Sequence, residues 1–345
     1  MNTGTGNQET AARRLYEDSI VVDCLNGSAL TPNVIERLAA SRVTAINLTA
    51  VQIGQDFDGA LRDLAQVCET VARHGDVLTL AREPAEVRRA KTDRRVAVIL
   101  GMQDAEPIGR DLTRLQTLAA LGVRIIQLTH NRQSFVGTGC AERDSGLTRF
   151  GRAVVAEMNR LGLVIDLAHC GAATTRDAIE ASSVPVMCSH SNPNAISRSL
   201  RNKDDGLIRA LAARGGLLGI ATWSPIVYRG NGRRPTLEDV LDCFDHACRV
   251  AGPEHVAIGS DLCEDASPTQ EAWAAVYGPG GQYPEITGGL GEWYSLATVN
   301  AAGLETITDL PNVPAGLLAR GHGTAAVKAM LGENFLRLFE RVRGH

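Results

Sequence analysis

The stretch FGRAVVAEMNRLGLVIDLAHC, residues 150–170, contains one full helix-and-strand unit of the fold. In residues 150–162 the apolar side chains recur at helical spacing and the segment ends in glycine, which predicts a helix with a common C-terminal stop. Residues 163–168 form a short apolar run, which predicts a buried strand. The unit ends at His169. A lone histidine there would most often be a buried core residue, so its meaning depends on which residues stand at the ends of the other strands.

The same kind of unit recurs along the chain, because short runs rich in Val and Ile alternate with segments of helical periodicity. The predicted strands are 19–25, 43–49, 96–102, 123–129, 163–168, 184–188, 216–221 and 255–260. The predicted helices include 58–75, 112–122, 150–162, 205–215 and 236–252. Apolar strands that alternate with helices favour a parallel sheet covered on both faces.

Eight such units predict an α/β fold of the (β/α)8 TIM-barrel type, in a single domain over residues 1–345. A doubly wound open sheet is the weaker alternative. Residues 264–290, rich in Gly, Pro and aromatic side chains, are predicted to form a long loop over the barrel mouth. The aromatic side chains there could serve as a lid, as a partner surface or simply as packing. Residues 323–342 are predicted to form a closing pair of amphipathic helices.

Composition argues against several classes of partner. The net charge is -4 and no block of Lys and Arg is present, which argues against nucleic acid and acidic membranes. The first residues lack the apolar segment of a secretion signal, and no apolar run is long enough to cross a bilayer. The 8 cysteines are scattered without a CxxC pair, as expected for reduced thiols. We therefore expect a cytoplasmic protein.

Polar side chains gather where the predicted strands end. His130, His169 and His190 come directly after three successive strands, and Asp261 comes after the last strand. In a barrel of this type the active site is built at the carboxyl ends of the strands. Neutral imidazoles on neighbouring strands suit Zn²⁺ or a similar ion, and an aspartate beside them can bind metal or accept a proton. The pattern therefore predicts a metal site.

Several long motifs resemble one known family. They are LGVRIIQLTHN (121–131), GLTRFGRAVVAEMNRLGLVIDLAHC (146–170), PVMCSHSN (185–192), RNKDD (201–205), AIGSDL (257–262) and the tail LPNVPAGLLARGHGTAAVKAMLGENFLRLF (310–339). In this order they resemble the membrane (renal) dipeptidase family, which are metallopeptidases of the amidohydrolase superfamily with a (β/α)8 barrel. The resemblance covers roughly residues 18–340.

The resemblance implies a role for each matching residue. His169 and His190 match the two histidines of the family's second metal site. Asp261 matches a metal ligand that also accepts a proton. His130 matches the histidine that contacts the substrate, and Arg201 matches an arginine that binds the substrate carboxylate.

The sequence departs from the family at the other metal ligands. In the stretch DCLNG, Leu25 stands for the histidine and Gly27 for the aspartate that bind the first metal. Gln103 stands for the glutamate that bridges the two metals, and a neutral amide offsets no charge between two cations. The family's two-metal site is therefore not expected here. Gln103, Asp104 or a cysteine could supply a third ligand beside the two histidines.

These considerations predict a divergent, dipeptidase-like hydrolase that acts on a small amide or peptide-like substrate bearing a carboxylate, with one zinc ion. Asp261 and His130 would be catalytic, and Arg201 and His130 would bind the substrate. One alternative is an isomerase, tautomerase or lyase on an amino-acid-like substrate, with one metal or none. Another is an inactive binding protein on the same scaffold. By resemblance, the protein is expected to be a homodimer.

Overall fold

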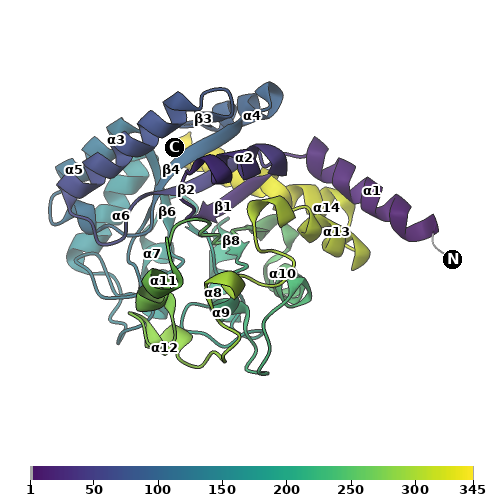
Figure 1. Ribbon diagram of the computed structural model, residues 1–345. Helices are drawn as coiled ribbons and strands as arrows, with labels where there is room; N and C mark the ends of the chain where they lie inside the picture. The colour runs from purple at the N-terminus through teal and green to yellow at the C-terminus, as the bar shows by residue number, and fades with distance from the viewer. Residues whose placement is uncertain (1–2, 345) are drawn as a thin grey trace.

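The structure is a computed structural model that describes residues 3–344, with side chains from Thr10 onward (Figure 1). Its strands all run parallel in one sheet. They are β1 (Val22–Asn26), β2 (Ala45–Val51), β3 (Leu78–Leu80), β4 (Val96–Met102), β5 (Val123–Gln127), β6 (Val164–Asp166), β7 (Met187–Cys188), β8 (Leu217–Ile220) and β9 (Val256–Ile258).

The sheet closes on itself into a barrel. The strand order is β1-β2-β4-β5-β6-β7-β8-β9. Beyond the last strand, Leu262 pairs in parallel with Asn26 at the end of β1. The amide of Asp261 donates to the carbonyl oxygen of Leu25 at 3.1 Å, and the amide of Gly27 donates to Leu262 O at 2.7 Å. The predicted (β/α)8 barrel is therefore confirmed, and the open-sheet alternative is wrong.

Two strands differ from the prediction for local reasons. β3 was not expected, because three residues make too short an apolar run to stand out; it pairs with the first half of β4, with Thr79 opposite Ala97. β7 is shorter than the predicted run 184–188. Pro185 lies within that run and has no N–H to donate to a sheet, so regular pairing begins after it.

The helices surround the barrel (Figure 1). They are α1 (Thr3–Asp18), α2 (Pro32–Ser41), α3 (Phe57–Arg73), α4 (Pro84–Asp93), α5 (Leu112–Leu121), α6 (Arg149–Leu161), α7 (Ala172–Ala181), α8 (Asp205–Ala213), α9 (Ser224–Val227), α10 (Leu237–Ala251), α11 (Gln270–Tyr277), α12 (Pro284–Thr287), α13 (Asn312–Ala319), α14 (Thr324–Lys328) and α15 (Asn334–Arg343). Gly162 ends α6 in the left-handed conformation expected of a C-terminal stop. Within residues 3–344, no helix is both long and apolar enough to span a membrane.

The C-terminal segment fills one end of the barrel. Helix α14 runs through a π turn (Ala329–Glu333) into α15, so this part is one bent helical run. Phe335 and Phe339 of α15 are fully buried, and they belong to the same apolar cluster as Val22, Ala97 and Val164 at the starts of three strands. α15 therefore covers the N-terminal ends of the strands, which leaves the opposite end for a site.

The end of β7 lies very close to its two neighbouring strands. A Cβ atom on Gly219 of β8 would collide with the carbonyl oxygen of Ser189, and so would one on Gly259 after β9. Because both positions are glycine, the backbone of residues 189 and 190 can lie directly against β8 and the end of β9. The position of His190 therefore depends on glycine at positions 219 and 259.

Replacing Gly219 with alanine should lower the free energy of unfolding by at least about 1–3 kcal/mol, because a methyl group has no space beside Ser189 O. Urea denaturation measures the change. Gly280→Ala is the control, since a Cβ there meets no atom within 4 Å. Equal stability of the two variants would contradict this account of the barrel.

Candidate metal and active site

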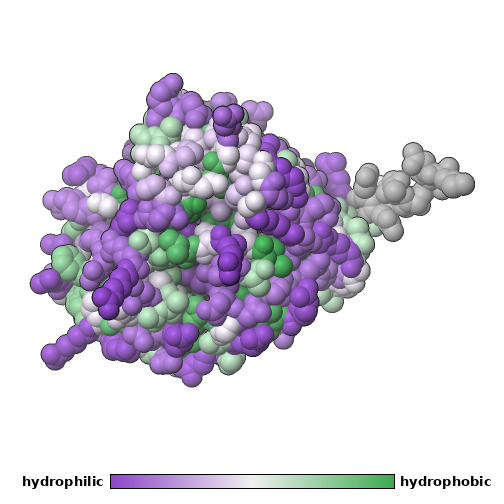
Figure 2. Space-filling model, turned by 90° about the horizontal axis from the view of Figure 1, so that it is seen from below, coloured by the Kyte–Doolittle hydropathy of each residue, from purple (hydrophilic) through white to green (hydrophobic). Residues whose placement is uncertain are grey.

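The predicted site residues meet in one pocket at the carboxyl ends of the strands. Gln103, His130, His169 and Asp261 all line it. Part of the remaining wall is aromatic and comes from residues 264–290, which contain α11 and α12. Both helices lie at the bottom of Figure 1, and the face seen from below is mostly hydrophilic with apolar patches near its centre (Figure 2).

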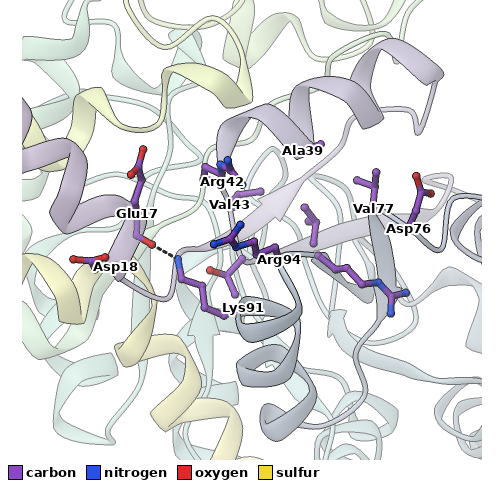
Figure 3. A pocket seen from close by; sticks show the side chains of 12 residues that line it. Glu17, Asp18, Ala39, Arg42, Val43, Asp76, Val77, Lys91 and Arg94 are labelled. Carbon is purple, nitrogen blue, oxygen red and sulfur yellow. Dashed lines mark hydrogen bonds between the residues drawn. The ribbon is translucent and has the colours of Figure 1, made fainter.

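A second cavity lies at the other end of the strands (Figure 3). Its walls come from residues just before β1, β2, β3 and β4, and they mix both charges, with Arg42 and Arg94 beside Glu17 and Asp76. Lys91 Nζ donates to the carbonyl oxygen of Glu17 at 2.6 Å. None of the predicted site residues lines this cavity. The pocket at the carboxyl ends is therefore the candidate active site.

His169 and His190 face one another across this site. Their Nε2 atoms are 2.9 Å apart. The Nδ1 atom of His169 is 2.7 Å from Asn131 Oδ1, and the Nδ1 atom of His190 is 2.6 Å from Ser189 Oγ. Ser189 Oγ in turn donates to Asp166 Oδ2 at 2.5 Å. Each ring is therefore held from behind, with its Nε2 atom aimed at the other ring.

These partners determine which nitrogen of each ring carries a proton. The one proton of the Ser189 hydroxyl goes to Asp166, so Ser189 Oγ accepts the N–H of His190 Nδ1. The Oδ1 atom of Asn131 likewise accepts from His169 Nδ1. Both Nε2 atoms then carry a lone pair, and that of His169 accepts from Arg201 Nη2 at 2.9 Å. Lone pairs at this distance repel unless a cation or a proton lies between them.

This donor pair fits a divalent metal ion such as zinc. Neutral imidazoles oriented by a second hydrogen bond are typical of metal-binding histidines. Burial and then the charge of Arg201 hold the pKa of both His169 and His190 well below the usual value, which keeps the rings neutral. Within the described residues, no three His, Cys, Asp or Glu side chains are already gathered at ligand spacing. A metal ion would therefore find two imidazoles here and no third ligand already in place.

Asp261 is the carboxylate beside the histidine pair. Its Oδ1 atom is 4.0 Å from His190 Nε2. Burial raises the pKa of Asp261 to about 7, against the opposing charge of Arg201. Its backbone has a φ of 60°, an uncommon value for a residue with a side chain, and such strain occurs at functional sites.

Positions 25 and 27, where the family has ligands of the first metal, are closely packed in this structure. Leu25 is buried. A Cβ atom on Gly27 would lie 2.7 Å from Cys263 Sγ, closer than such atoms approach in proteins. An aspartate at position 27 would therefore require Cys263 to move. Burial raises the pKa of the Cys263 thiol far above its usual value, so this sulfur is protonated.

The two candidate third ligands differ in position. Gln103 lines the pocket, and its Nε2 atom donates to Thr49 Oγ1 at 2.9 Å. Asp104 is turned to the backbone instead, because its oxygens accept from the amides of Gly54 at 2.7 Å and Glu106 at 3.2 Å. The structure thus brings Gln103, but not Asp104, into the pocket.

Arg201 and His130 both lie against His169. Arg201 is fully buried and does not line the pocket. It donates from Nη1 to Ala168 O at 3.1 Å and from Nη2 to His169 Nε2 at 2.9 Å. His130 stacks on His169 with 4.0 Å between ring centroids. Burial, then the charge of Arg201, lowers the pKa of His130 to about 3, so its ring is neutral.

Sequence reasoning missed the residues that hold the site in place. Asn131 and Ser189 each lie next to a histidine in the chain, which is the one signal that could have marked them. Asp166 looked like part of a strand. The three aromatic residues of the segment 264–290, Trp273, Tyr277 and Tyr283, all line the pocket, although the sequence left open whether they pack or face a substrate.

A closed parallel barrel with histidines and an aspartate at its strand ends defines the class of amidohydrolase-type barrels. The profile of the membrane dipeptidase family, peptidase family M19, matches residues 11–273. The chain therefore belongs to the membrane dipeptidase family.

Individual relatives agree with this assignment. The chain is 30% identical over 275 residues to dipeptidase VerJ of Clonostachys rogersoniana, a match that covers 79% of this chain and 62% of the relative. It is 28% identical over 253 residues to an uncharacterized dipeptidase of Schizosaccharomyces pombe, covering 72% and 53%. The matches thus span less than two thirds of either relative. The crystal structure of an amidohydrolase from Pseudomonas aeruginosa superposes with a TM-score of 0.88 at 28% identity, over 97% of this chain and 99% of that one.

Replacing Ser189 with alanine should release the tautomer of His190, because its Nδ1 proton loses its acceptor. In ¹⁵N NMR spectra of the histidine rings, the wild type should show Nδ1 protonated and Ser189→Ala a mixture. Ser260→Ala is the matched control, since Ser260 makes the same two bonds, to Asp23, without touching a histidine. A His190 tautomer that is unchanged in Ser189→Ala would refute this assignment.

Proposed function

We propose that the protein is a metal-dependent hydrolase of small peptide-like amides that works with a single metal ion, zinc being the ion that two imidazoles and a carboxylate suit best. The supporting observation is the pair of Nε2 atoms, 2.9 Å apart, whose rings are both held through Nδ1 by a hydrogen-bond acceptor. To bind the ion, His169 Nε2 would exchange its bond with Arg201 Nη2. His169 and His190 would hold the ion, with Asp261 as the third protein ligand. A metal ion in such a site polarises a carbonyl group and makes water a better nucleophile.

Asp261 is suited to move the proton of the attacking water. Burial raises its pKa to about 7 in the absence of a metal, and a bound cation would lower that pKa, so the carboxylate would be ionised and able to accept the proton. Its carboxylate lines the pocket beside the histidines. Proton delivery to the leaving amine by the same carboxylate would complete the hydrolysis.

His130 and the aromatic residues would shape the substrate side of the pocket. The neutral ring of His130 can donate a hydrogen bond to a carbonyl oxygen as negative charge develops on it. Tyr283 OH is 3.3 Å from His130 Nδ1 and orients the ring. Trp223 and Tyr277 form an edge-to-face pair in the wall, and such apolar walls exclude water from the reaction.

The packing around Gly27 supports a count of one ion. Leu25 offers no ligand atom, and Cys263 Sγ occupies the space that an aspartate at position 27 would need. Gln103, which stands where the family's bridging glutamate would be, is a neutral amide and brings no charge to offset the repulsion between two cations.

A second candidate is a non-hydrolytic enzyme that moves protons without a metal, such as an isomerase or lyase. The contact of Arg201 Nη2 with His169 Nε2 favours it, because a guanidinium then satisfies the lone pair that a metal would take.

The eight cysteines, all unpaired within the described residues, support a reducing compartment for either enzyme. A homodimer remains a prediction.

Metal analysis by plasma mass spectrometry of the untagged protein tests the first proposal. About one equivalent of zinc is expected, because one pair of imidazole donors is present, and the His169→Ala/His190→Ala variant should lose it. His322→Ala is the control, since His322 pairs with Asp245 outside the pocket. Two equivalents would contradict the account of Leu25 and Gly27. No metal even after zinc loading would favour the second candidate.

Turnover in water enriched in ¹⁸O separates the two chemistries. A hydrolase acting on dipeptides or N-acyl amino acids should release an amine and place one ¹⁸O atom in the new carboxylate, in a chelator-sensitive reaction. Asp261→Asn should lower kcat by at least about 10²-fold, the usual contribution of a general base. Product formed without ¹⁸O would count against hydrolysis.

A further inference from the structure

Asn300 presents an unused amide group to the pocket. Its side chain is 5% exposed and lines the site. The Oδ1 atom is buried and has no hydrogen-bond partner among the described residues. An unpaired buried carbonyl costs roughly 1–3 kcal/mol, so a protein retains one where a ligand satisfies it.

The backbone of Asn300 is fixed while its side chain is not. Residue 300 pairs with Trp223 just past β8, where Ala301 N donates to Thr222 O at 2.9 Å. The carbonyl oxygen of Asn300 accepts from Arg234 Nε at 3.0 Å and Nη2 at 2.8 Å. Rigid attachment of a residue with a free polar group is the arrangement expected of a recognition residue.

The pocket that Asn300 lines combines apolar residues with one acidic residue, Asp261. Trp223, Trp273 and Val299 line the pocket with it, and the described lining contains no lysine or arginine. Trp273 is 3% exposed, and its Nε1–H is a second buried group without a partner. A neutral amide would find an acceptor in Asn300 Oδ1 and a donor in Trp273 Nε1.

We propose that Asn300 recognises the amide of a substrate that carries a bulky apolar, preferably aromatic, side chain. The amide N–H of the substrate donates to Asn300 Oδ1, and its side chain packs on Trp223 and Tyr277, whose ring centroids are 6.4 Å apart. This rests on the proposed function in so far as the pocket is the substrate site of the hydrolase. It adds the substrate class, which is a peptide-like amide with a large hydrophobic residue rather than a small one.

Binding, measured by calorimetry without turnover, tests this assignment with three probes. They are N-acetyl-L-phenylalaninamide, N-acetylglycinamide, which lacks the ring, and 2-phenylethanol, which lacks the amide. The wild type should bind the first at least tenfold more tightly than the second. Asn300→Leu should weaken the first roughly three- to tenfold, the contribution of one neutral hydrogen bond, and leave 2-phenylethanol unchanged.

Asn312→Leu is the matched control, because Asn312 is exposed and outside the pocket. Asn300→Ala repeats the test with a smaller side chain in case leucine disturbs folding. Equal binding of the two N-acetyl amides by the wild type, no binding of any probe, or an unchanged affinity in both Asn300 variants would overturn the proposal. If the probes bind as expected but no amide takes up ¹⁸O, the proposed hydrolase activity alone is refuted. If the protein hydrolyses amides but the Asn300 variants bind the probes as the wild type does, the recognition role of Asn300 alone is refuted.

Discussion

Two buried aspartates hold the carboxyl ends of the strands in place. Asp23 accepts from the amide of Ser260 at 2.7 Å and from its hydroxyl at 2.6 Å, and Asp166 accepts from Ser189 in the same way at 2.8 and 2.5 Å. A buried carboxylate is costly without such partners, and burial still raises the pKa of Asp23 to about 6. Each serine directly precedes a site residue, Asp261 or His190. The geometry of the site therefore depends on two hydrogen-bonded pairs that never touch a substrate.

The site differs from that of its family in the side chains that occupy the first metal position, while the barrel itself is unchanged. Leu25 is buried and Cys263 Sγ occupies the space beside Gly27, while His169 and His190 are each held by a hydrogen bond at Nδ1. One half of the site thus keeps two oriented imidazoles, while Leu25 and Gly27 in the other half offer no side-chain ligand.

The sequence alone predicted the barrel because the strand signal is repeated eight times, and errors in single strands do not change the class. It placed His130, His169, His190 and Asp261 at the strand ends, where the structure has them. It could not predict that Arg201 turns toward His169 or that Asp104 turns toward the backbone of Gly54, because both depend on loop conformation. Asn300 lies far beyond the last strand and reaches the pocket through a pairing with Trp223 that no local pattern reveals.

The position of helix α15 at the end of the chain affects the order in which the barrel can fold during synthesis. Phe335 and Phe339 supply the floor of the barrel, yet they are translated after every strand that they cover. A nascent chain that has already released β9 from the ribosome still has its barrel interior open to water at one end. Until residues 334–342 emerge, the apolar side chains at the N-terminal ends of the strands lack their cover, so we expect the barrel to complete its folding only after the tail has been made.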